Sequence, residues 1–271
     1  MIFMPDVRKI LERYPNVLEV GKDAKKARKK AKRIKRKTEF KELGEILAVY
    51  LQRETSNAFR LNSHLAFDYG RKVQRGFGLG LDEIEEMVNL ILPEKIIEFE
   101  KEIRVKLCDD LFDSYLGYFF SGLYHDVIED RDSITFDLRK TLPKFPHLRY
   151  RLSNKWGFGY RHSRGELILL GYPGGYVGHE MSGGKIEVIG STSDRVGYKM
   201  RGGEIIVRGS CGWRTGDEMK GGRIIVEGDV GEWTGINMVG GEIRVRKSIK
   251  SLGKRLGGKI SVWKDGWVEI D

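Results

Sequence analysis

The stretch MKGGRIIVEGDVGEWTGINMVGGEIRV, from Met219 to Val245, decides the fold of this chain. It contains one pattern twice, nineteen residues apart: a methionine, a spacer residue, two glycines and a short strand rich in β-branched residues. A fixed period of about twenty residues is typical of a solenoid, in which each repeat forms one coil and neighbouring coils stack on one another. The pattern therefore indicates a solenoid.

The unit of the repeat is Gly-x-x-Met-x-Gly-Gly-x-Ile-x-Val, and four of the seven methionines lie at its fourth position. A degenerate copy starts at Gly159 and a shortened copy at Gly253. Leu148 and Tyr150 keep the register one coil earlier. We therefore expect the array to begin near His147 and to contain about six or seven coils. The intact copies begin at Gly178, Gly197, Gly216 and Gly235.

Each unit holds one strand of about four or five residues, which is too short to bury a core alone. Stacked in register, such strands form parallel ladders about 4.8 Å apart, with the Ile and Val of each unit pointing inward. The two glycines suit a corner that needs a positive φ or a close approach of backbones. Methionine at a recurring inward position fills an irregular gap because its side chain is unbranched. The result is a parallel β-helix, and we expect it to be right-handed because parallel crossovers almost always are.

The segments GDEMKGGRIIVEGDVGEWTG and GEWTGINMVGGEIRV resemble the glycine-repeat (GXGXG) domain that forms the β-helix subunit of formylmethanofuran dehydrogenase. The C-terminal domain of the large glutamate synthase subunit is similar to them too. The resemblance spans residues 147–271. It implies a right-handed β-helix with a structural role, which holds other domains or subunits in place and carries no catalytic residues. The chain departs from the pattern in its first half and in its last coil, where KSIKSLGKRL replaces the Gly-Asp-x-Gly-x-Trp connection.

Glycine marks the boundary between two halves, because 27 of the 35 glycines lie from Gly157 onward. The first half favours helices, among them one that begins at Asp82 and ends before Pro93. Residues 134–138 alternate as a strand does. TLPKFPHL, at 141–148, is typical of a linker. The predicted fold class is α+β: a mostly α-helical domain over 1–146, then a single-stranded solenoid of 19-residue coils over 147–271.

The whole composition bounds the class of protein. Apolar residues make up 40% and charged residues 32% of the chain, and no run of 18 apolar residues exists, so we expect no membrane-spanning helix. The start, MIFMPDVRK, lacks the features of a signal peptide, which indicates a cytoplasmic protein. Two cysteines are too few for a disulfide framework or a cysteine-ligated metal cluster. Scarce Gln and Asn beside abundant Lys, Arg and Glu are typical of heat-adapted proteins.

The net charge of +10 comes from one segment, KDAKKARKKAKRIKRK at 22–37, which holds eleven basic residues and one acid. The segment is predicted to be a helix with a narrow alanine stripe. It could bind nucleic acid or another polyanion with strong salt dependence. A solvated helix that packs on a neighbour has the same pattern, and no interleaved aromatic residues are present to stack on bases. The residues that would contact a polyanion are Lys25, Lys26, Arg28, Lys29, Lys32, Arg33, Lys35 and Arg36.

No catalytic constellation has support in the sequence. RGFGLGLDE, at 75–83, lacks the strand and the acid of a dinucleotide-binding fingerprint, so it is interpreted as a loop. His125 and the acids that follow it fit no zinc motif, and Cys211 is interpreted as packing. We therefore predict no catalytic, cofactor or metal residues. The predicted function is a non-catalytic scaffold, built as a homo-oligomer or as part of a complex such as a formylmethanofuran dehydrogenase-like oxidoreductase. The alternative is a nucleic-acid-binding protein that uses residues 22–37.

Two surfaces are candidate interfaces for a partner. The outward positions of the strands are apolar in the earlier coils and charged in the later ones, so we expect the helical half to cover the apolar part, or else a second copy or a partner protein. Two tryptophans in neighbouring coils are expected to occupy equivalent positions, where they either stack on the rod or form a partner-binding ridge. The candidate interface residues are Ile168, Leu170, Ile189, Ile206, Ile225, Trp213 and Trp233.

The end of the chain predicts a cap for the solenoid. WKDGWVEI places Asp265-Gly266 between two strand-like pieces, a pair typical of a two-residue hairpin turn. We expect Trp267–Ile270 to pair with Ile260–Val262 and so to block the free edge of the last coil.

Overall fold

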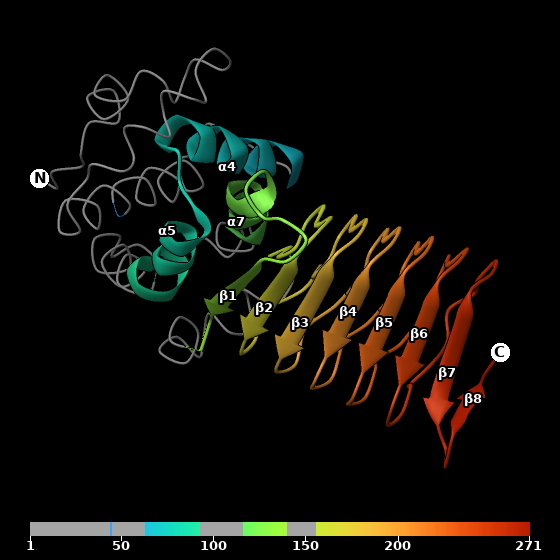
Figure 1. The fold of residues 1–271 in the computed structure, drawn as a ribbon. Coiled ribbons are helices and arrows are strands. Elements are labelled where there is room, and N and C mark those ends of the chain that lie inside the picture. Colours follow the sequence, from blue (N-terminus) through green and yellow to red (C-terminus); the bar gives the residue numbers. More distant parts are fainter. Residues whose placement is uncertain (1–43, 45–62, 93–115, 140–155) are drawn as a thin grey trace, which may run out of the picture.

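The computed structural model of the chain describes residues 44, 63–92, 116–139 and 156–271. Within them lies an eight-stranded sheet whose strands follow sequence order (Figure 1). The basic segment 22–37 and the expected first coil around 147–150 fall outside these residues. The elements are α4 Ser63–Phe77, α5 Leu81–Glu86, the π-helical turn η2 Met87–Ile91, α7 Leu116–His125, β1 Ser133–Asp137, β2 Glu166–Leu170, β3 Lys185–Ile189, β4 Glu204–Val207, β5 Arg223–Val226, β6 Glu242–Val245, β7 Lys259–Trp263 and β8 Trp267–Glu269.

Strands β1 to β7 form one parallel ladder along the rod, which confirms a β-solenoid. From β2 to β6 each strand residue pairs with the residue nineteen positions on, as Ile186 does with Ile205 and Ile205 with Ile224. The six strands β2 to β7 fall one in each copy from Gly159 to Gly253, and the chain makes about five turns between them; the further coil expected from His147 lies outside the described residues. The inward columns are fully buried: Ile186, Ile205, Ile224 and Ile243, and Val188, Val207, Val226 and Val245.

The methionine column fills the interior as the repeat predicts. All four repeat methionines are fully buried, and each packs its methyl end against the second glycine of the next coil. In the degenerate first copy His162 takes the same position and is also buried. An unbranched side chain reaches this corner because it bends to follow the gap. The column consists of Met181, Met200, Met219 and Met238.

The two glycines of the unit have different tasks. The first one approaches the backbone of the preceding coil: a Cβ on Gly221 would lie 2.5 Å from the carbonyl oxygen of Arg201. The second one has a left-handed backbone, with φ +86 at Gly222. Both physical reasons for the glycine pair therefore apply, one to each residue.

The sheet begins earlier in the chain than the nineteen-residue register predicts. β1 pairs in parallel with β2, with Ile134 opposite Leu167 and Phe136 opposite Leu169. The strand predicted for this stretch is thereby confirmed, and it pairs into the solenoid sheet. The period misses it because 33 residues, not nineteen, separate the paired positions. The helices and the coils also share one continuous core, in which Phe120 stacks on Phe158.

Helix α5 and the turn η2 cover the free edge of β1. The backbone N–H of Thr135 donates to Oε2 of Glu85 (2.8 Å), and the amide of Asn89 donates to the carbonyl of Thr135 (2.9 Å). The N–H of Asp137 donates to Oδ1 of Asn89 (2.6 Å). These side chains replace a neighbouring strand, so the first edge of the ladder is closed without a coil.

Helices α4 and α7 touch through glycines. A Cβ on Gly70 would meet the carbonyl oxygen of Phe119, and a Cβ on Gly122 would meet that of Phe67. Gly117 lies as closely against the first described turn of the solenoid, at the backbone of Trp156. Helix α7 is buried from Leu116 to Tyr124 because it lies between α4 and the rod, which explains why its residues are apolar on all sides.

The last coil ends in the predicted hairpin cap. β8 pairs antiparallel with β7, with Val262 opposite Val268, and the N–H of Ile270 donates to the carbonyl of Ile260 (2.9 Å). The turn is longer than expected: Trp263 pairs with Trp267, so three residues form the loop. The left-handed position in it is Asp265, with φ 55, and not the glycine that follows.

Replacing Gly221 by alanine should destabilise the solenoid by ~2–4 kcal/mol, because the new Cβ would meet backbone that cannot move without separating two coils. Chemical denaturation of the full chain measures this loss. Gly266→Ala is the matched control, since nothing lies within 4 Å of its Cβ position. It should change the stability by less than about 1 kcal/mol. Equal effects of the two substitutions would contradict the proposed role of the glycine pair.

Candidate functional site

A column of aromatic rings lies at one corner of the solenoid, next to the helices. Tyr160, His179 and Tyr198 each follow the left-handed glycine that opens a unit, so they occupy the same position in three successive coils. The ring centroids of Tyr160 and His179 are 4.9 Å apart, as are those of His179 and Tyr198. The glycine fixes the direction in which each ring leaves the backbone, and the nineteen-residue register stacks the rings.

Two helices complete this cluster. The hydroxyl of Tyr118, on α7, is hydrogen-bonded to Nδ1 of His179 at 2.9 Å. The hydroxyl of Tyr160 is hydrogen-bonded to Nδ1 of His64, on α4, at 2.6 Å. The rings of Tyr118 and Tyr160 meet edge to face at 4.9 Å. We call His64, Tyr118, Tyr160, His179 and Tyr198 the junction cluster, because it joins α4 and α7 to the coils.

Charged residues surround the junction cluster in balanced pairs. The guanidinium of Arg161 lies 5.1 Å from the ring centroid of Tyr160 and binds Glu180 at 2.9 Å. The ammonium of Lys199 lies 4.9 Å from the ring centroid of Tyr198 and 3.8 Å from Glu218. The hydroxyl of Tyr198 donates to the same Glu218 at 3.0 Å. Each cation therefore rests on a ring and faces a carboxylate.

Burial sets the protonation of His179 and Tyr160 in the cluster. It lowers the pKa of His179 from 6.5 to about 4, so this side chain is neutral at pH 7. It also raises the pKa of Tyr160, with a further contribution from the charge of Glu180, so that phenol stays protonated. Neutral imidazole and phenol groups that are bonded to one another hold elements in position. The arrangement favours a structural joint.

A second tyrosine–histidine pair lies one layer deeper. Nε2 of His162 donates to the carbonyl of Gly165 at 3.2 Å, which leaves Nδ1 to accept from the hydroxyl of Tyr124 at 3.4 Å. Burial lowers the pKa of His162 from 6.5 to about 4 and raises that of Tyr124. This histidine thus fills the methionine position and also bonds α7 to the first described coil.

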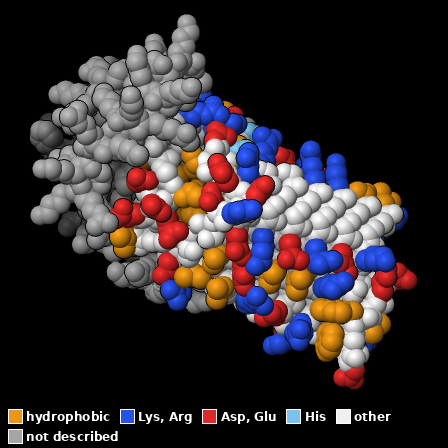
Figure 2. Space-filling model, viewed as in Figure 1, with side chains coloured by type: hydrophobic (Ala, Val, Ile, Leu, Met, Phe, Trp, Pro, Cys, Tyr) orange, Lys and Arg blue, Asp and Glu red, His pale blue; other side chains and the backbone are white. Residues whose placement is uncertain are grey.

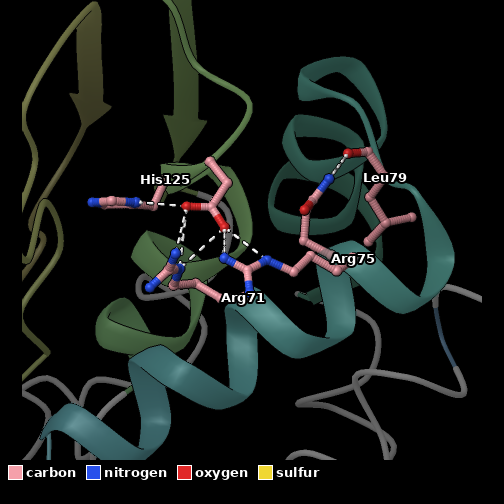
Figure 3. Close-up of polar contacts among 6 residues, drawn as sticks. Arg71, Arg75, Leu79 and His125 are labelled. Carbon is pink, nitrogen blue, oxygen red and sulfur yellow. Dashed lines mark hydrogen bonds and ion pairs between the residues drawn. The ribbon is translucent and has the colours of Figure 1, made fainter. Parts of the chain in front are cut away.

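An ionic contact fixes the far end of α7 to α4 (Figure 3). The carboxylate of Asp126 accepts from Nε of Arg71 at 3.1 Å, from Nη2 of Arg75 at 2.6 Å and from Nδ1 of His125 at 3.1 Å. Partial burial would raise the pKa of Asp126, but the hydrogen bonds from Arg71, His125 and Arg75 outweigh it and lower the pKa from 3.8 to about 2. His125 and Asp126, which fit no zinc motif in the sequence, therefore serve this contact.

The outer face of the sheet carries a ladder of alternating charges (Figure 2). Lys185 binds Glu166 at 2.6 Å, and Arg223 binds Glu242 at 2.9 Å and Glu204 at 3.6 Å. Acid and base alternate because the first residue of each strand stacks on its equivalents in the coils on either side. A search of the repeat for apolar residues alone misses this signal, although it is present at the same spacing. The column reads Glu166, Lys185, Glu204, Arg223, Glu242 and Lys259.

The predicted apolar stripe lies on the same outer face. Ile189 is 51% exposed, whereas the other four residues are half-buried between their neighbours. Among the described helices, α5 and η2 contact β1, at the end of the sheet, and do not lie over the stripe (Figure 1). That the first half or a partner covers the stripe stays a prediction. The four half-buried residues are Ile168, Leu170, Ile206 and Ile225.

The two tryptophans of the predicted ridge are not at equivalent positions. The residue nineteen before Trp233 is Arg214, and both have left-handed backbones, with φ 56 and 57. Trp213 lies one residue earlier in its coil. The two indoles nevertheless meet edge to face at 5.7 Å, and Trp213 is 49% exposed and Trp233 40%. The expectation of one ring directly above the other is therefore wrong by one residue.

The remaining predicted features have structural places. Cys211 is buried, and its backbone forms a parallel β-bridge with Val230 in the next coil, as expected of a packing residue. The glycine-rich loop is the end of α4, where the left-handed Gly78 ends the helix and Gly80 begins α5. In the described part of the chain, no three His, Cys, Asp or Glu residues converge as metal ligands would. The eight predicted polyanion-binding residues, from Lys25 to Arg36, lie outside the described residues.

No helix within the described ranges has the length and apolar character that crossing a bilayer requires. Comparisons of the chain with known protein families, with curated proteins and with solved structures found no match.

Replacing His162 by methionine, the residue that the repeat uses there, should make the protein less sensitive to mild acid. The pKa of His162 is lowered in the folded state, so the unfolded chain binds the extra proton between pH 6.5 and 4. The stability that neutral His162 contributes is therefore fully present above pH 6.5. It is lost as the pH drops toward 4, by up to about 3 kcal/mol for one such group. Urea unfolding at pH 7.5 and pH 5 should show a smaller difference for His162→Met than for the wild type. An unchanged difference would contradict this role.

Replacing Asp126 by asparagine should lower stability at pH 7 by ~1 kcal/mol, a value reduced for the solvent that reaches the contact. The pKa of Asp126 is depressed, so its contribution is present above pH 4 and is lost as the pH falls through 2. Unfolding curves of variant and wild type should therefore converge near pH 2. Asp265→Asn, at the exposed hairpin tip, is the control and should change the stability at pH 7 by less than about 0.5 kcal/mol.

Proposed function

We propose that this protein is a non-catalytic scaffold, in which the solenoid is a rigid platform for other domains or subunits. The proposal includes right-handed winding of the coils and a likeness to the β-helix subunit of formylmethanofuran dehydrogenase and the corresponding glutamate synthase domain. Under it the chain is not an enzyme by itself, and it acts within a larger assembly or as a homo-oligomer.

The observation that carries the proposal is that buried titratable side chains bond one element of the protein to another. The buried histidines are neutral and bonded to tyrosines, and the buried Cys211 is kept as a thiol because burial raises its pKa to about 12. The ionic contact at Asp126 joins two helices. Each of these groups connects one element to another, as the groups of a scaffold are expected to do.

The surface offered to a partner is the outer face of β2 to β5. Charges on it are paired within the ladder, so they contribute little free attraction for a partner. The apolar stripe between them, with Ile189 the most exposed member, is the part that gains from being covered. A second copy or a partner protein with a flat apolar face matches this surface. The nucleic-acid alternative rests on residues 22–37, and no described contact bears on it.

The test is to replace Ile189 by glutamate in the full tagged chain and to measure its assembly. The wild type is expected to form a defined oligomer in solution, or to recover a stoichiometric partner from its native cells. Burying a charge in the interface should weaken that assembly by at least about 10-fold, because an unpaired buried charge costs several kcal/mol. Light scattering after size exclusion and quantitative affinity purification are the measurements.

Val239→Glu is the matched control, because Val239 is 48% exposed but lies at a different corner of the coil. It should leave the assembly intact. A wild-type chain that is monomeric at micromolar concentration and recovers no stoichiometric partner would overturn the scaffold proposal.

A further inference from the structure

The last coil differs from the rest of the solenoid in its charge. Residues 156–242 carry ten basic and eleven acidic side chains, whereas residues 243–271 carry eight basic and three acidic ones, the acids being Asp265, Glu269 and Asp271 in the cap. This surplus is independent of the basic segment at 22–37 and lies at the opposite end of the rod from the helices (Figure 1). The eight residues are Arg244, Arg246, Lys247, Lys250, Lys254, Arg255, Lys259 and Lys264.

The charge ladder runs out of acids at this coil. Glu242 is already bound by Arg223 at 2.9 Å and by Arg244 at 2.7 Å, so Lys259, the next member of the column, finds no free carboxylate. Three of the eight cations, Arg244, Lys250 and Arg255, bind a carboxylate. The other five are exposed and make no ion pair with any described residue; they are Arg246, Lys247, Lys254, Lys259 and Lys264.

Two exposed tryptophans lie among these cations. Trp263 on β7 and Trp267 on β8 meet edge to face with centroids 5.3 Å apart, and they are 40% and 37% exposed. The guanidinium of Arg246 lies 5.4 Å from the ring centroid of Trp263, and that of Arg244 lies 5.4 Å from the ring centroid of Trp267. Figure 2 shows hydrophobic side chains beside Lys and Arg at this end of the rod. We call Arg244, Arg246, Lys247, Lys259, Trp263 and Trp267 the terminal surface.

We propose that the terminal surface binds single-stranded nucleic acid. Unpaired Lys and Arg attract phosphates and release their counterions, and exposed indoles offer faces on which bases stack. A single strand fits because its bases are unpaired and can turn outward to stack on the indoles. The bases of a duplex are paired and stacked on one another, so they cannot.

Two other functions of the terminal surface would explain only some of its residues. An acidic peptide would engage the cations but would leave the paired indoles without a task. Blocking end-to-end growth of the solenoid needs only the hairpin and some charge, and both would serve without two large aromatic side chains in water. Stacking partners explain the tryptophans and the cations together.

The experiment uses the full chain in which the eight predicted polyanion-binding residues from Lys25 to Arg36 are changed to glutamine, so that the two basic regions are not confused. Binding to fluorescein-labelled oligothymidylate and oligouridylate of about 20 nucleotides, a length above the usual site sizes, is followed by fluorescence anisotropy at several salt concentrations. Trp263→Leu with Trp267→Leu should weaken binding by about 5- to 100-fold. Arg246→Gln, Lys247→Gln and Lys259→Gln together should reduce the slope of log Kd against log salt by about 2, at about 0.7 for each phosphate contact.

Matched controls separate the terminal surface from tryptophan and charge in general. Trp213→Leu with Trp233→Leu removes an indole pair of similar exposure from mid-rod, and Arg164→Gln, Arg201→Gln and Lys220→Gln remove three exposed cations from earlier coils. Both sets should change Kd by less than about 2-fold, as surface changes away from a site usually do. Trp263→Phe with Trp267→Phe keeps aromatic faces in the cap and should retain most of the affinity.

Three outcomes would overturn the proposal. The first is that the chain with the neutralised 22–37 segment no longer binds either oligonucleotide. The second is that the leucine variants, shown to be folded by an unchanged thermal transition, bind as the wild type does. The third is that polyglutamate competes as well as the oligonucleotides do, which would assign the surface to acidic peptides. Loss of assembly in the scaffold test is a separate result, because Ile189 on β3 lies four strands away from Trp263 on β7 along the same outer face.

Discussion

The close approach of backbone at the first glycine of each unit is the constraint on which the rest of the structure depends. There the chain leaves no room for a Cβ between one coil and the carbonyl oxygen of the coil before, as at Gly221 against Arg201. Once that spacing is fixed, the inward Ile and Val columns come into contact and the methionine fills the corner left beside the second glycine. The charge ladder follows from the same stacking, because residues nineteen apart become neighbours across the sheet.

The two ends of the ladder are closed in different ways. At the first end the side chains of Glu85 and Asn89 bond to the free edge of β1, and at the last end β8 folds back as a hairpin. The helices are also attached to the coils near this end, since Tyr118 and Tyr124 of α7 are hydrogen-bonded to His179 and His162. Because His162 and His179 are neutral in the folded state and free histidine gains a proton near pH 6.5, this joint loses stability as the pH falls from 6.5 toward 4.

The contrast between paired and unpaired charge links the two proposed uses of the surface. Along β2 to β6 the carboxylates and cations bond to one another, which leaves the apolar stripe as the feature that a protein partner could recognise. At the last coil and cap basic residues outnumber acidic ones, and Lys259, Arg246 and Lys247 make no ion pair with a described residue, so they stay available to an anion beside Trp263. The two proposed surfaces therefore lie on one face of the rod, with the protein-binding part over β2 to β5 and the nucleic-acid-binding part at the last coil and cap.

The repeat by itself determined the parallel solenoid and its buried columns, because each unit carries the residues that stack it in register on the next. The turn pair Asp265-Gly266 determined the hairpin that closes it. Only the tertiary structure decided the rest. β1 joins the sheet through a spacing of 33 residues that no period contains, and the junction cluster brings His64 and Tyr118 to Tyr160 from distant parts of the chain. The one-residue offset of Trp233 from Trp213 likewise depended on which residue takes the left-handed corner. These contacts join elements that are far apart in the sequence and arise when the helices pack on the coils. They do not recur at a fixed spacing, so no sequence repeat reveals them.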